Sequence, residues 1–475
     1  MTPRLSSGLA RLDDVLGGGL PDDAITLVAG APGTGKTILA QHFAFHNATP
    51  ERPAIYCSTV SEPVEKLLRY GQSLKMFDVS AVGTSVLYED LGGVAAEPDG
   101  LERVNTRLDA LLREHQPTVI VVDSFKALHP FADDAAAYRR FLHELAGRLS
   151  ARPVSTFLLG EYTPDEVGAT PEFAVADVIL SLVAERHGYR TARYLEVVKM
   201  RGGSYASGSH AYQITDAGLS IYPRTADAIE AAPYEQGDER VSTGIEALDD
   251  LIQDGYWPGA ATLVVGPTGA GKTLMGLHFL FEGAANGEPG ILATLQESDA
   301  QLERILGGYG WTMDEPAVEI YSRTPVALLI DEWLHDVLDL AAAHGARRLV
   351  VDSLRDLSVA AQDTMRFREY MYSLTRRCAR SQISLLMTLE VPELFGLTRL
   401  SELEVSHLAD NVVVLQYLPD GDRLRRTITV LKTRASAHEP MRHEFIISSD
   451  GIRLTRAPSS MESTVGDPGQ RSQQD

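Results

Sequence analysis

The sequence predicts an α/β protein of two tandem domains, each a mainly parallel sheet covered by helices on both faces. Near-continuous apolar segments alternate with amphipathic segments along the chain, as expected for buried parallel strands connected by helices. A glycine-rich turn of one pattern occurs twice, each time directly after an apolar segment. The chain has 475 residues, which is too long for one ordinary hydrophobic core.

The first glycine-rich turn lies within Ile25 to Thr37, which reads ITLVAGAPGTGKT. The spacing GxxxxGK[ST] between a strand and a helix is typical of a loop that binds nucleotide phosphates, because glycines let successive N–H groups face an anion. Lys36 is expected at the β- and γ-phosphates and Thr37 at Mg²⁺. The residues expected to bind the nucleotide are Gly30, Gly33, Thr34, Gly35, Lys36 and Thr37.

The second turn lies within Ala261 to Thr273, which reads ATLVVGPTGAGKT. Its expected nucleotide-binding residues are Gly266, Thr268, Gly269, Ala270, Gly271, Lys272 and Thr273, the last also at Mg²⁺. A flexible glycine turn is the alternative for a single match, but two matches in the same context argue against coincidence. The expected ligands are therefore ATP and Mg²⁺, one set in each half.

The repeat extends beyond the loops. LSSGLARLDDVLGGGLP precedes the first loop and VSTGIEALDDLIQDGYWPG precedes the second. Later residues recur at similar shifts: 236 positions from Lys36 to Lys272, and 233 from Lys199 to Lys432. We therefore expect domains at 1–222 and 241–456, a linker at 223–240, and a disordered tail at 457–475, where apolar residues are nearly absent.

The other strands are expected where short apolar runs recur. In the first domain these runs are Ala54 to Ser58, Thr118 to Val122, Ser155 to Leu159 and Val178 to Leu182. In the second they are Gly290 to Thr294, Arg348 to Val351, Ile383 to Thr388 and Val412 to Leu415. Two hairpins are expected beside the sheets, from Tyr194 to Met200 with Ala211 to Ile214, and from Arg426 to Lys432 with His443 to Ile447.

Carboxylates follow the predicted strands in both halves. Asp123 ends TVIVVDS and Asp352 ends RLVVDS, at the sheet edge where α/β proteins bind ligands, so each is a candidate Mg²⁺ residue. The alternative role is to cap the next turn. Glu62 and Glu297 each follow an earlier strand and could orient and deprotonate the attacking water. For them the alternative is an ordinary solvated glutamate.

A lysine and an arginine recur near the end of each domain. VVKMRGGS contains Lys199 and Arg201, and VLKTRASA contains Lys432 and Arg434. Strand alternation puts the two cations of each pair on one face, where they could reach a phosphate. They could equally be solvated edge-strand charges. A third interpretation is that they serve the nucleotide of a neighbouring subunit.

These motifs together resemble the KaiC family of RecA-like P-loop ATPases, over roughly residues 5–456. The doubled loop, SGLxxLDxxLGGGLP, the two VVDS segments and KMRGGS carry the resemblance. It implies a double-layered homo-hexameric ring with ATP at subunit interfaces, slow hydrolysis, and serine/threonine autophosphorylation in the second layer of some members. It also implies that Lys199 and Arg201 reach the adjacent protomer's nucleotide.

The sequence departs from the family in several places. The family has two adjacent glutamates after the second strand, whereas Ser61 and Gln296 replace the first of each pair here. Ala435 stands where glycine follows the arginine in the first copy. The segment LEVSHLADNVVVLQY corresponds to the family's phosphorylation segment. It makes Ser406 a candidate phosphoacceptor, with an ordinary serine as the alternative, and puts His407 at the usual threonine.

Composition restricts the function further. The formal net charge of −22 opposes nucleic-acid binding, which depends on cationic surface. The chain has no apolar run long enough for a membrane helix and no signal-peptide pattern, so a cytoplasmic location is expected. The predicted function is a slow ATPase that acts in signalling with an unidentified protein partner. A DNA-dependent motor and a nucleotide-stabilised scaffold are the alternatives.

Overall fold

The structure is a computed structural model that describes residues 3–60, 62–163, 166, 170–187, 190–225, 239–326, 328–361, 363–392, 405–434, 436–438 and 441–455. The chain divides into two compact units, residues 1–228 and 229–475. Most of the expected linker, the expected tail, Ser61 and Ala435 lie outside the described residues. The expected domain boundaries and the disorder of the tail therefore stay predictions.

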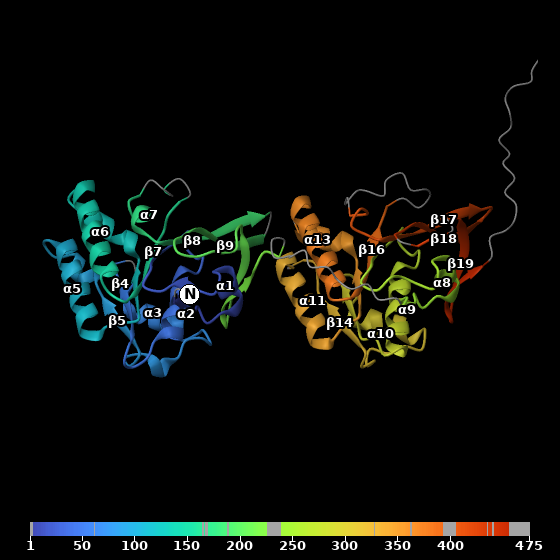
Figure 1. The fold of residues 1–475 in the computed structure, drawn as a ribbon, viewed down its shortest axis with the longest axis horizontal. Helices are drawn as coiled ribbons and strands as arrows, with labels where there is room; N and C mark the ends of the chain where they lie inside the picture. The colour runs from blue at the N-terminus through green and yellow to red at the C-terminus, as the bar shows by residue number, and fades with distance from the viewer. Residues whose placement is uncertain are drawn as a thin grey trace, which may run out of the picture. The chain divides into compact units, whose positions relative to one another are not determined.

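The first unit is built on a nine-stranded sheet (Figure 1). Its parallel part contains, in spatial order, β5 (Val86–Asp90), β4 (Ala54–Ser58), β6 (Val119–Asp123), β7 (Ser155–Gly160), β3 (Ile25–Gly30) and β8 (Val178–His187). The antiparallel strands β9 (Arg190–Met200), β10 (His210–Thr215) and β11 (Gly218–Tyr222) continue it. A separate pair, β1 (Arg4–Leu5) with β2 (Leu20–Pro21), precedes the sheet.

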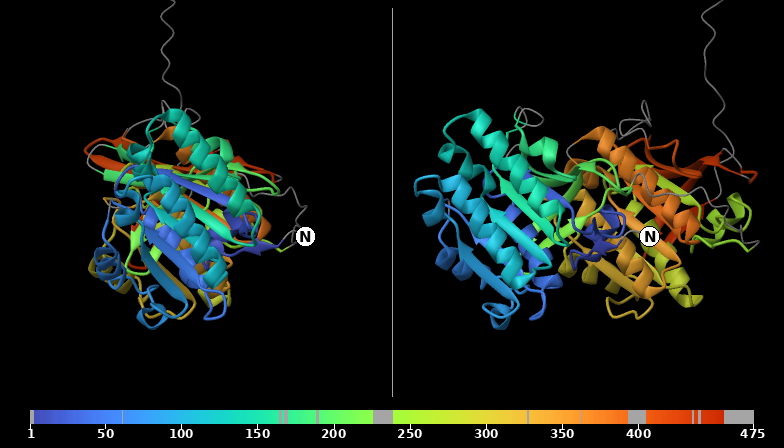
Figure 2. Two further views of the ribbon diagram at one scale, coloured as in Figure 1. Left: turned by 90° about the vertical axis from the view of Figure 1, so that its left-hand side faces the viewer. Right: turned by 60° about the vertical axis from the view of Figure 1, so that its left-hand side comes forward.

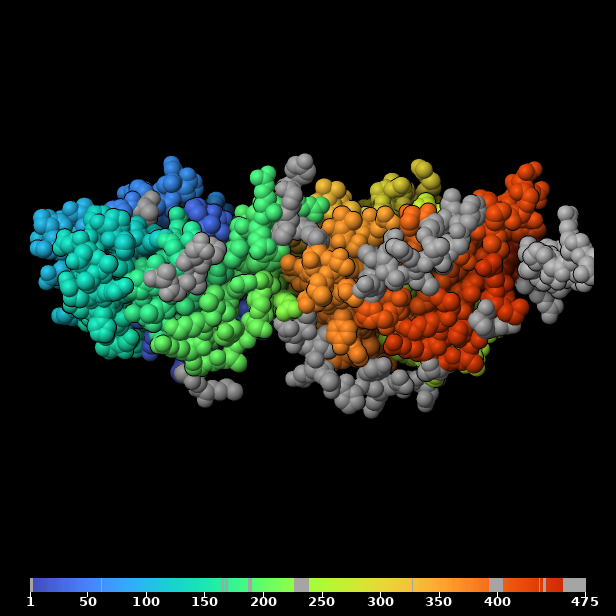
Figure 3. Space-filling view, turned by 90° about the horizontal axis from the view of Figure 1, so that it is seen from above, coloured from blue at the N-terminus to red at the C-terminus, as the bar shows by residue number. Residues whose placement is uncertain are grey.

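The second unit repeats this order strand for strand. The parallel strands are β14 (Val318–Ser322), β13 (Gly290–Thr294), β15 (Arg348–Asp352), β16 (Ser384–Glu390), β12 (Ala261–Gly266) and β17 (Asn411–Asp420). The antiparallel extension contains β18 (Arg423–Thr433), β19 (Arg442–Ser448) and β20 (Gly451–Thr455). Both extensions reach the molecular surface, green in the first unit and orange to red in the second (Figure 3).

Helices cover both faces of each sheet, because each parallel strand carries apolar side chains on both faces. In the first unit α1 (Ala10–Val15), α2 (Lys36–Asn47) and α3 (Val64–Gly71) pack on one face, and α5 (Gly100–His115) and α6 (Ala135–Ser150) on the other (Figure 2). Shorter elements are η1 (Val79–Ala81), α4 (Gly92–Ala95), η2 (Phe125–Phe131) and α7 (Glu172–Val175).

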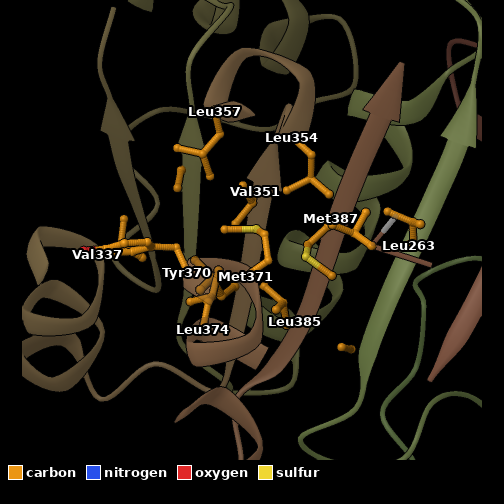
Figure 4. Packing of buried hydrophobic residues seen from close by; sticks show 14 of the residues in the cluster. Leu263, Val337, Val351, Leu354, Leu357, Tyr370, Met371, Leu374, Leu385 and Met387 are labelled. Atoms are coloured by element: carbon orange, nitrogen blue, oxygen red, sulfur yellow. The ribbon is translucent and has the colours of Figure 1, made fainter. Parts of the chain in front are cut away.

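The second unit has the same arrangement. One face carries α8 (Glu246–Leu251), α9 (Lys272–Ala285) and α10 (Asp299–Gly307), and the other carries α11 (Ile330–His344), α12 (Leu354–Ala361) and α13 (Thr364–Arg380). In Figure 4, Tyr370, Met371 and Leu374 of α13 pack against the strand residues Val351 and Leu385. This packing of α13 on the sheet holds in place the strands whose ends lead into the loops of the second unit.

The predicted fold class, the listed strands and both hairpins are confirmed. The sequence reasoning missed the edge strands β5 and β14, because VLYED and VEIYS each have only one fully buried residue and carry acidic residues. It also missed β11 and β20, which follow tight glycine turns. No helix in the described part of the chain is long and apolar enough to cross a membrane.

Candidate functional site

The first glycine-rich loop connects β3 to α2 at the carboxyl edge of the sheet. Gly33 (φ 74°) and Gly35 (φ 90°) adopt left-handed backbone conformations, which residues with a Cβ rarely adopt. Lys36 is buried, and its Nζ donates to the carbonyl oxygens of Gly30 at 2.9 Å and Ala31 at 3.0 Å. The ammonium group therefore lies inside the curl of the loop, where the phosphates of a nucleotide would bind.

The second loop has the same construction between β12 and α9. Gly269 (φ 74°) and Gly271 (φ 106°) are left-handed, and the Nζ of Lys272 donates to the carbonyl oxygen of Pro267 at 2.9 Å. Burial lowers the pKa of Lys272, and the charges of Glu390 and Asp352 oppose that shift. Both loops thus hold a buried cation beside carboxylates.

In the first half the metal candidates Thr37 and Asp123 are in direct contact. The hydroxyl of Thr37 donates to Asp123 Oδ2 at 2.7 Å, and the Tyr56 hydroxyl donates to the same oxygen at 2.6 Å. Burial raises the pKa of Asp123, while the hydrogen bonds from Tyr56 and Thr37 lower it. A carboxylate and a hydroxyl side by side at the phosphate loop fit Mg²⁺, which takes oxygen ligands.

The second half pairs Thr273 with Asp352 in the same way, the hydroxyl donating to Oδ2 at 2.7 Å. The other partner differs, because Thr388 of β16 donates to Asp352 Oδ1. Both carboxylate oxygens are therefore held here. The peptide bond after each aspartate, to Ser124 and to Ser353, is cis.

Glu62 lies in a cavity of about 960 Å³ next to the first loop. Its carboxylate pairs with Lys66 of α3 at 3.0 Å and is 31% exposed, so it is reachable from the cavity. The cavity is lined by loop residues, by α3 and by strand ends, among them Lys36, Thr37, Tyr70, Leu74, Asp123, Lys126, Glu161 and Ile214. Its volume lies in the range usual for small-molecule sites, about 300–1,000 Å³.

Glu297 lines the corresponding cavity of the second half, which is smaller at about 270 Å³. Burial, and then the charge of Asp352, raise the pKa of Glu297. Its neighbour Gln296 donates to Asp356 Oδ2 at 2.6 Å and to the Ser353 hydroxyl at 3.2 Å. Tyr309, Ile305 and Ile447 also line this cavity.

The Lys199 and Arg201 pair lies away from the loop of its own half. Lys199 Nζ donates to the Ala176 carbonyl at 2.6 Å, and Arg201 pairs with Asp177 at 3.4 Å. Asp177 also accepts from the backbone N–H of Ile25, the first residue of β3, whereas the phosphate loop follows the last residue of that strand. At about 3.3 Å per residue, the length of the strand separates the two places by roughly 16 Å.

The second pair repeats this geometry. Lys432 Nζ donates to the Ala409 carbonyl at 2.5 Å, and Arg434 pairs with Asp410 at 3.2 Å. Asp410 accepts from the backbone N–H of Ala261 at the start of β12. In both halves a register shift precedes the lysine and leaves an exposed apolar residue, Val198 or Leu431. Ser406 lies nearby, its carbonyl 3.5 Å from Lys432 Nζ.

Three groups of site residues were missed by the sequence reasoning. The hairpin β10–β11 covers the first loop, since Tyr212 donates its hydroxyl to the Thr34 carbonyl, and a Cβ on Gly35 would lie 3.1 Å from Ile214. Glu161 and Glu390 lie at the ends of β7 and β16 and line the cavities. Lys126 also lines the first cavity. The end of an apolar strand was the available signal for the two glutamates.

Each phosphate-loop helix carries a histidine that accepts a hydrogen bond from the terminal hairpin, buried in the first half and partly buried in the second. His42 Nε2 accepts from the Leu219 N–H at 3.0 Å, and His278 Nε2 accepts from the Ile452 N–H at 3.2 Å. Burial, with a smaller contribution from His46, lowers the pKa of His42 to about 4. The hairpin that covers the loop is therefore fixed by a neutral histidine.

We expect the stability of the first half to fall as the pH drops from 6.5 to about 4. The folded pKa of His42, about 4, lies below its ordinary value of 6.5, so only the unfolded chain takes up this proton between those values. At 1.36 kcal/mol per pKa unit, the free energy of unfolding falls by on the order of 3 kcal/mol. Urea unfolding of the first half, followed between pH 7 and pH 4, measures it.

His42→Gln removes the titrating group, so its stability should depend less on pH than that of the wild type over this interval. His143→Gln is the control, because His143 is exposed on α6. A His42→Gln protein with the unchanged pH slope of the wild type would contradict the assignment.

Comparison with known proteins agrees with this geometry. The family model described as "ATPase: KaiC" matches residues 5–226 and 241–459. A circadian clock oscillator protein KaiC of Acaryochloris marina is 29% identical over 472 residues, which covers 95% of this chain and 88% of the relative. The protein of that name from Synechococcus elongatus is 28% identical over 458 residues, covering 92% and 86%. With one family match in each half, the chain belongs to the KaiC ATPase family.

Proposed function

We propose that each half binds Mg²⁺-ATP and that the chain forms a homo-hexameric ring, which hydrolyses ATP slowly at its subunit interfaces. The observation that carries this proposal is the position of Lys199 and Arg201 at the amino end of β3, opposite their own loop. In a head-to-tail contact, the amino edge of one copy faces the carboxyl edge of the next. The two cations would then reach a neighbour's nucleotide. A cytoplasmic signalling role belongs to the same proposal.

Each site residue of the first half has a separate role in the proposed reaction. The loop N–H groups and Lys36 bind the phosphates, and Thr37 with Asp123 would hold Mg²⁺. Bound Mg²⁺ supplies neutralisation of charge on the β- and γ-phosphates. Glu62 orients the attacking water and accepts its proton. In the second half Lys272, Thr273, Asp352 and Glu297 take these roles, with Lys432 and Arg434 acting on a neighbour.

Two measurements on the full chain test the proposal. Light scattering with and without Mg²⁺-ATP should give a hexamer with nucleotide, and phosphate release should be slow but dependent on Lys36 and Lys272. A monomer that releases phosphate at the same rate would overturn interfacial catalysis. A hexamer that releases no phosphate would instead identify the nucleotide-stabilised scaffold.

One observation favours the scaffold for the second half. Gln296 stands where the family has the first glutamate, and its side-chain amide is hydrogen-bonded to Ser353 and Asp356. An amide cannot accept the proton of the attacking water. Ser61, the corresponding residue of the first half, lies outside the described residues. The DNA-dependent motor has no such support, and stimulation of phosphate release by DNA at physiological salt would be needed to revive it.

Autophosphorylation at Ser406 is part of the proposal for the second half. Ser406 is partly exposed in the turn whose carbonyl groups contact Lys432 and Arg434, the cations proposed to reach a neighbour's nucleotide. After incubation with Mg²⁺-ATP, intact-mass measurement should detect one added phosphate on the wild type and none on Ser406→Ala. Phosphate that persists on Ser406→Ala, or that never appears on the wild type, would remove this idea.

A further inference from the structure

Lys126 contributes a second ammonium group to the first cavity. It lies three residues after Asp123, in η2, and lines the cavity together with Lys36, Thr37 and Asp123. We propose that Lys126 is a second phosphate-binding cation of this site, which contacts the γ-phosphate of ATP bound in its own half. The proposal rests on nucleotide binding by the first loop and adds a residue to it.

The contacts of Lys126 hold its ammonium group at the cavity wall. Nζ donates to the Glu161 carbonyl at 2.6 Å and to the Glu166 carboxylate at 2.7 and 2.8 Å. It also lies 4.9 Å from the centre of the Tyr162 ring. The side chain is 32% exposed, so it is neither fixed in the core nor free in solvent. These contacts use the three N–H donors of the ammonium group at the cavity wall, so a phosphate binds it by replacing one of these acceptors.

Glu161 connects this group to the phosphate loop. Its carbonyl accepts from Lys126, and the charge of its carboxylate raises the pKa of Lys36, against the larger opposite effect of burial. Glu161 also lines the same cavity. Both lysines therefore line one cavity with Glu161, and a triphosphate that contacts Lys36 lies in the cavity that Lys126 also lines.

Lys126 would leave Glu166 by exchanging this carboxylate for the γ-phosphate of a bound nucleotide. The hydrogen bond from Lys126 is the main reason that the pKa of Glu166 falls to about 2, so Glu166 is ionised at neutral pH. A γ-phosphate carries more negative charge than one carboxylate and offers several acceptor oxygens, so it competes for the same ammonium. ADP has no phosphate at that position. Lys126 should therefore distinguish ATP from ADP.

The second half offers a matched control in Arg355, which also lies three residues after its aspartate. Arg355 is exposed in the first turn of α12, and the described residues that line the second cavity do not include it. The same sequence position thus carries a cation in both halves, but only Lys126 is directed to a nucleotide cavity in the structure described here.

The experiment measures affinity for Mg²⁺-ADP and for the non-hydrolysable β,γ-imido analogue of ATP by calorimetry on the full chain. The substitution Lys272→Ala removes nucleotide binding by the second half, and Lys126→Met is then introduced into that variant. We expect roughly 10- to 100-fold weaker binding of the ATP analogue, as for a lost charged hydrogen bond, and little change for ADP. Equal weakening of both nucleotides, or no change in either, would overturn the proposal.

Further variants distinguish loss of the Lys126 contact from a folding defect and from failure of the proposed nucleotide binding. Lys126→Arg keeps the charge and should restore most of the preference for the ATP analogue, and Arg355→Met in the Lys36→Ala background should change nothing at the second site. Glu166→Gln should leave analogue binding unchanged or tighter. If it instead weakens binding as much as Lys126→Met, the pair is only structural and the proposal is wrong. A parent protein that binds no nucleotide would refute the proposed function itself.

Discussion

Replacing both Lys36 and Lys272 with alanine is expected to abolish nucleotide binding and phosphate release. Each lysine is buried inside a loop whose N–H groups alone cannot neutralise a triphosphate. Loss of one charged contact costs about 1.5–3 kcal/mol, and a lysine that contacts two phosphates loses more than one. We therefore expect affinity to fall at least about 100-fold in each half, as measured by calorimetry with Mg²⁺-ATP.

Single variants should each remove one of the two binding events, which assigns the sites to the halves. Lys75→Ala is the control, because Lys75 is 73% exposed and pairs with Asp216, outside the residues that line the first cavity. A doubly substituted protein that still released phosphate would defeat the assignment of both loops.

Arg201→Ala is expected to reduce phosphate release from the first half strongly, although Arg201 does not touch the loop of its own chain. Arginines that act across an interface contribute about 10³- to 10⁵-fold in other nucleotide hydrolases. Nucleotide affinity should change much less than the turnover rate, because the loop of each chain stays intact. Single-turnover phosphate release, measured in the Lys272→Ala background, separates the two effects.

Mixed assemblies give the decisive form of this test. In the Lys272→Ala background, Arg201→Ala chains keep an intact first loop and Lys36→Ala chains keep an intact arginine, so neither should be active alone. Random mixing in equal amounts restores about a quarter of the interfaces if the arginine acts on a neighbour. Activity of the mixture that stays at the level of the separate variants would show that Arg201 has no role in trans.

The two halves share a topology but not an identical site. Thr37 and Tyr56 both donate to one oxygen of Asp123, whereas Thr273 and Thr388 donate to different oxygens of Asp352. The first cavity is also larger, at about 960 Å³ against about 270 Å³. Tyr309 and Ile305 line the second cavity at the positions where Leu74 and Tyr70 line the first. These differences lie outside the loop motif itself.

Much of the site was predictable because its chemistry is local in sequence. The six consecutive loop residues before Lys36 determine where Lys36 and Thr37 lie relative to the expected phosphates. The apolar run before Asp123 identifies this residue as the end of a strand. The structure then brings Thr37, in the first turn of α2, to 2.7 Å from Asp123, because the loop before α2 follows β3 at the sheet edge where β6 ends. Glu62 and Glu297 were found in the same way and lie in the cavities.

The sequence by itself determined the doubled phosphate loop, most of the strands around it and the carboxylates at the strand ends, because each depends on residues close together in the chain. Only the tertiary structure decided that Lys199 and Arg201 lie at the opposite end of β3, that Tyr212 closes on Thr34, and that Lys126 enters a cavity while Arg355 does not. Tyr212 and Thr34 are 178 positions apart, so their contact depends on how the whole sheet is ordered. A local pattern of residue types carries no information about such an arrangement.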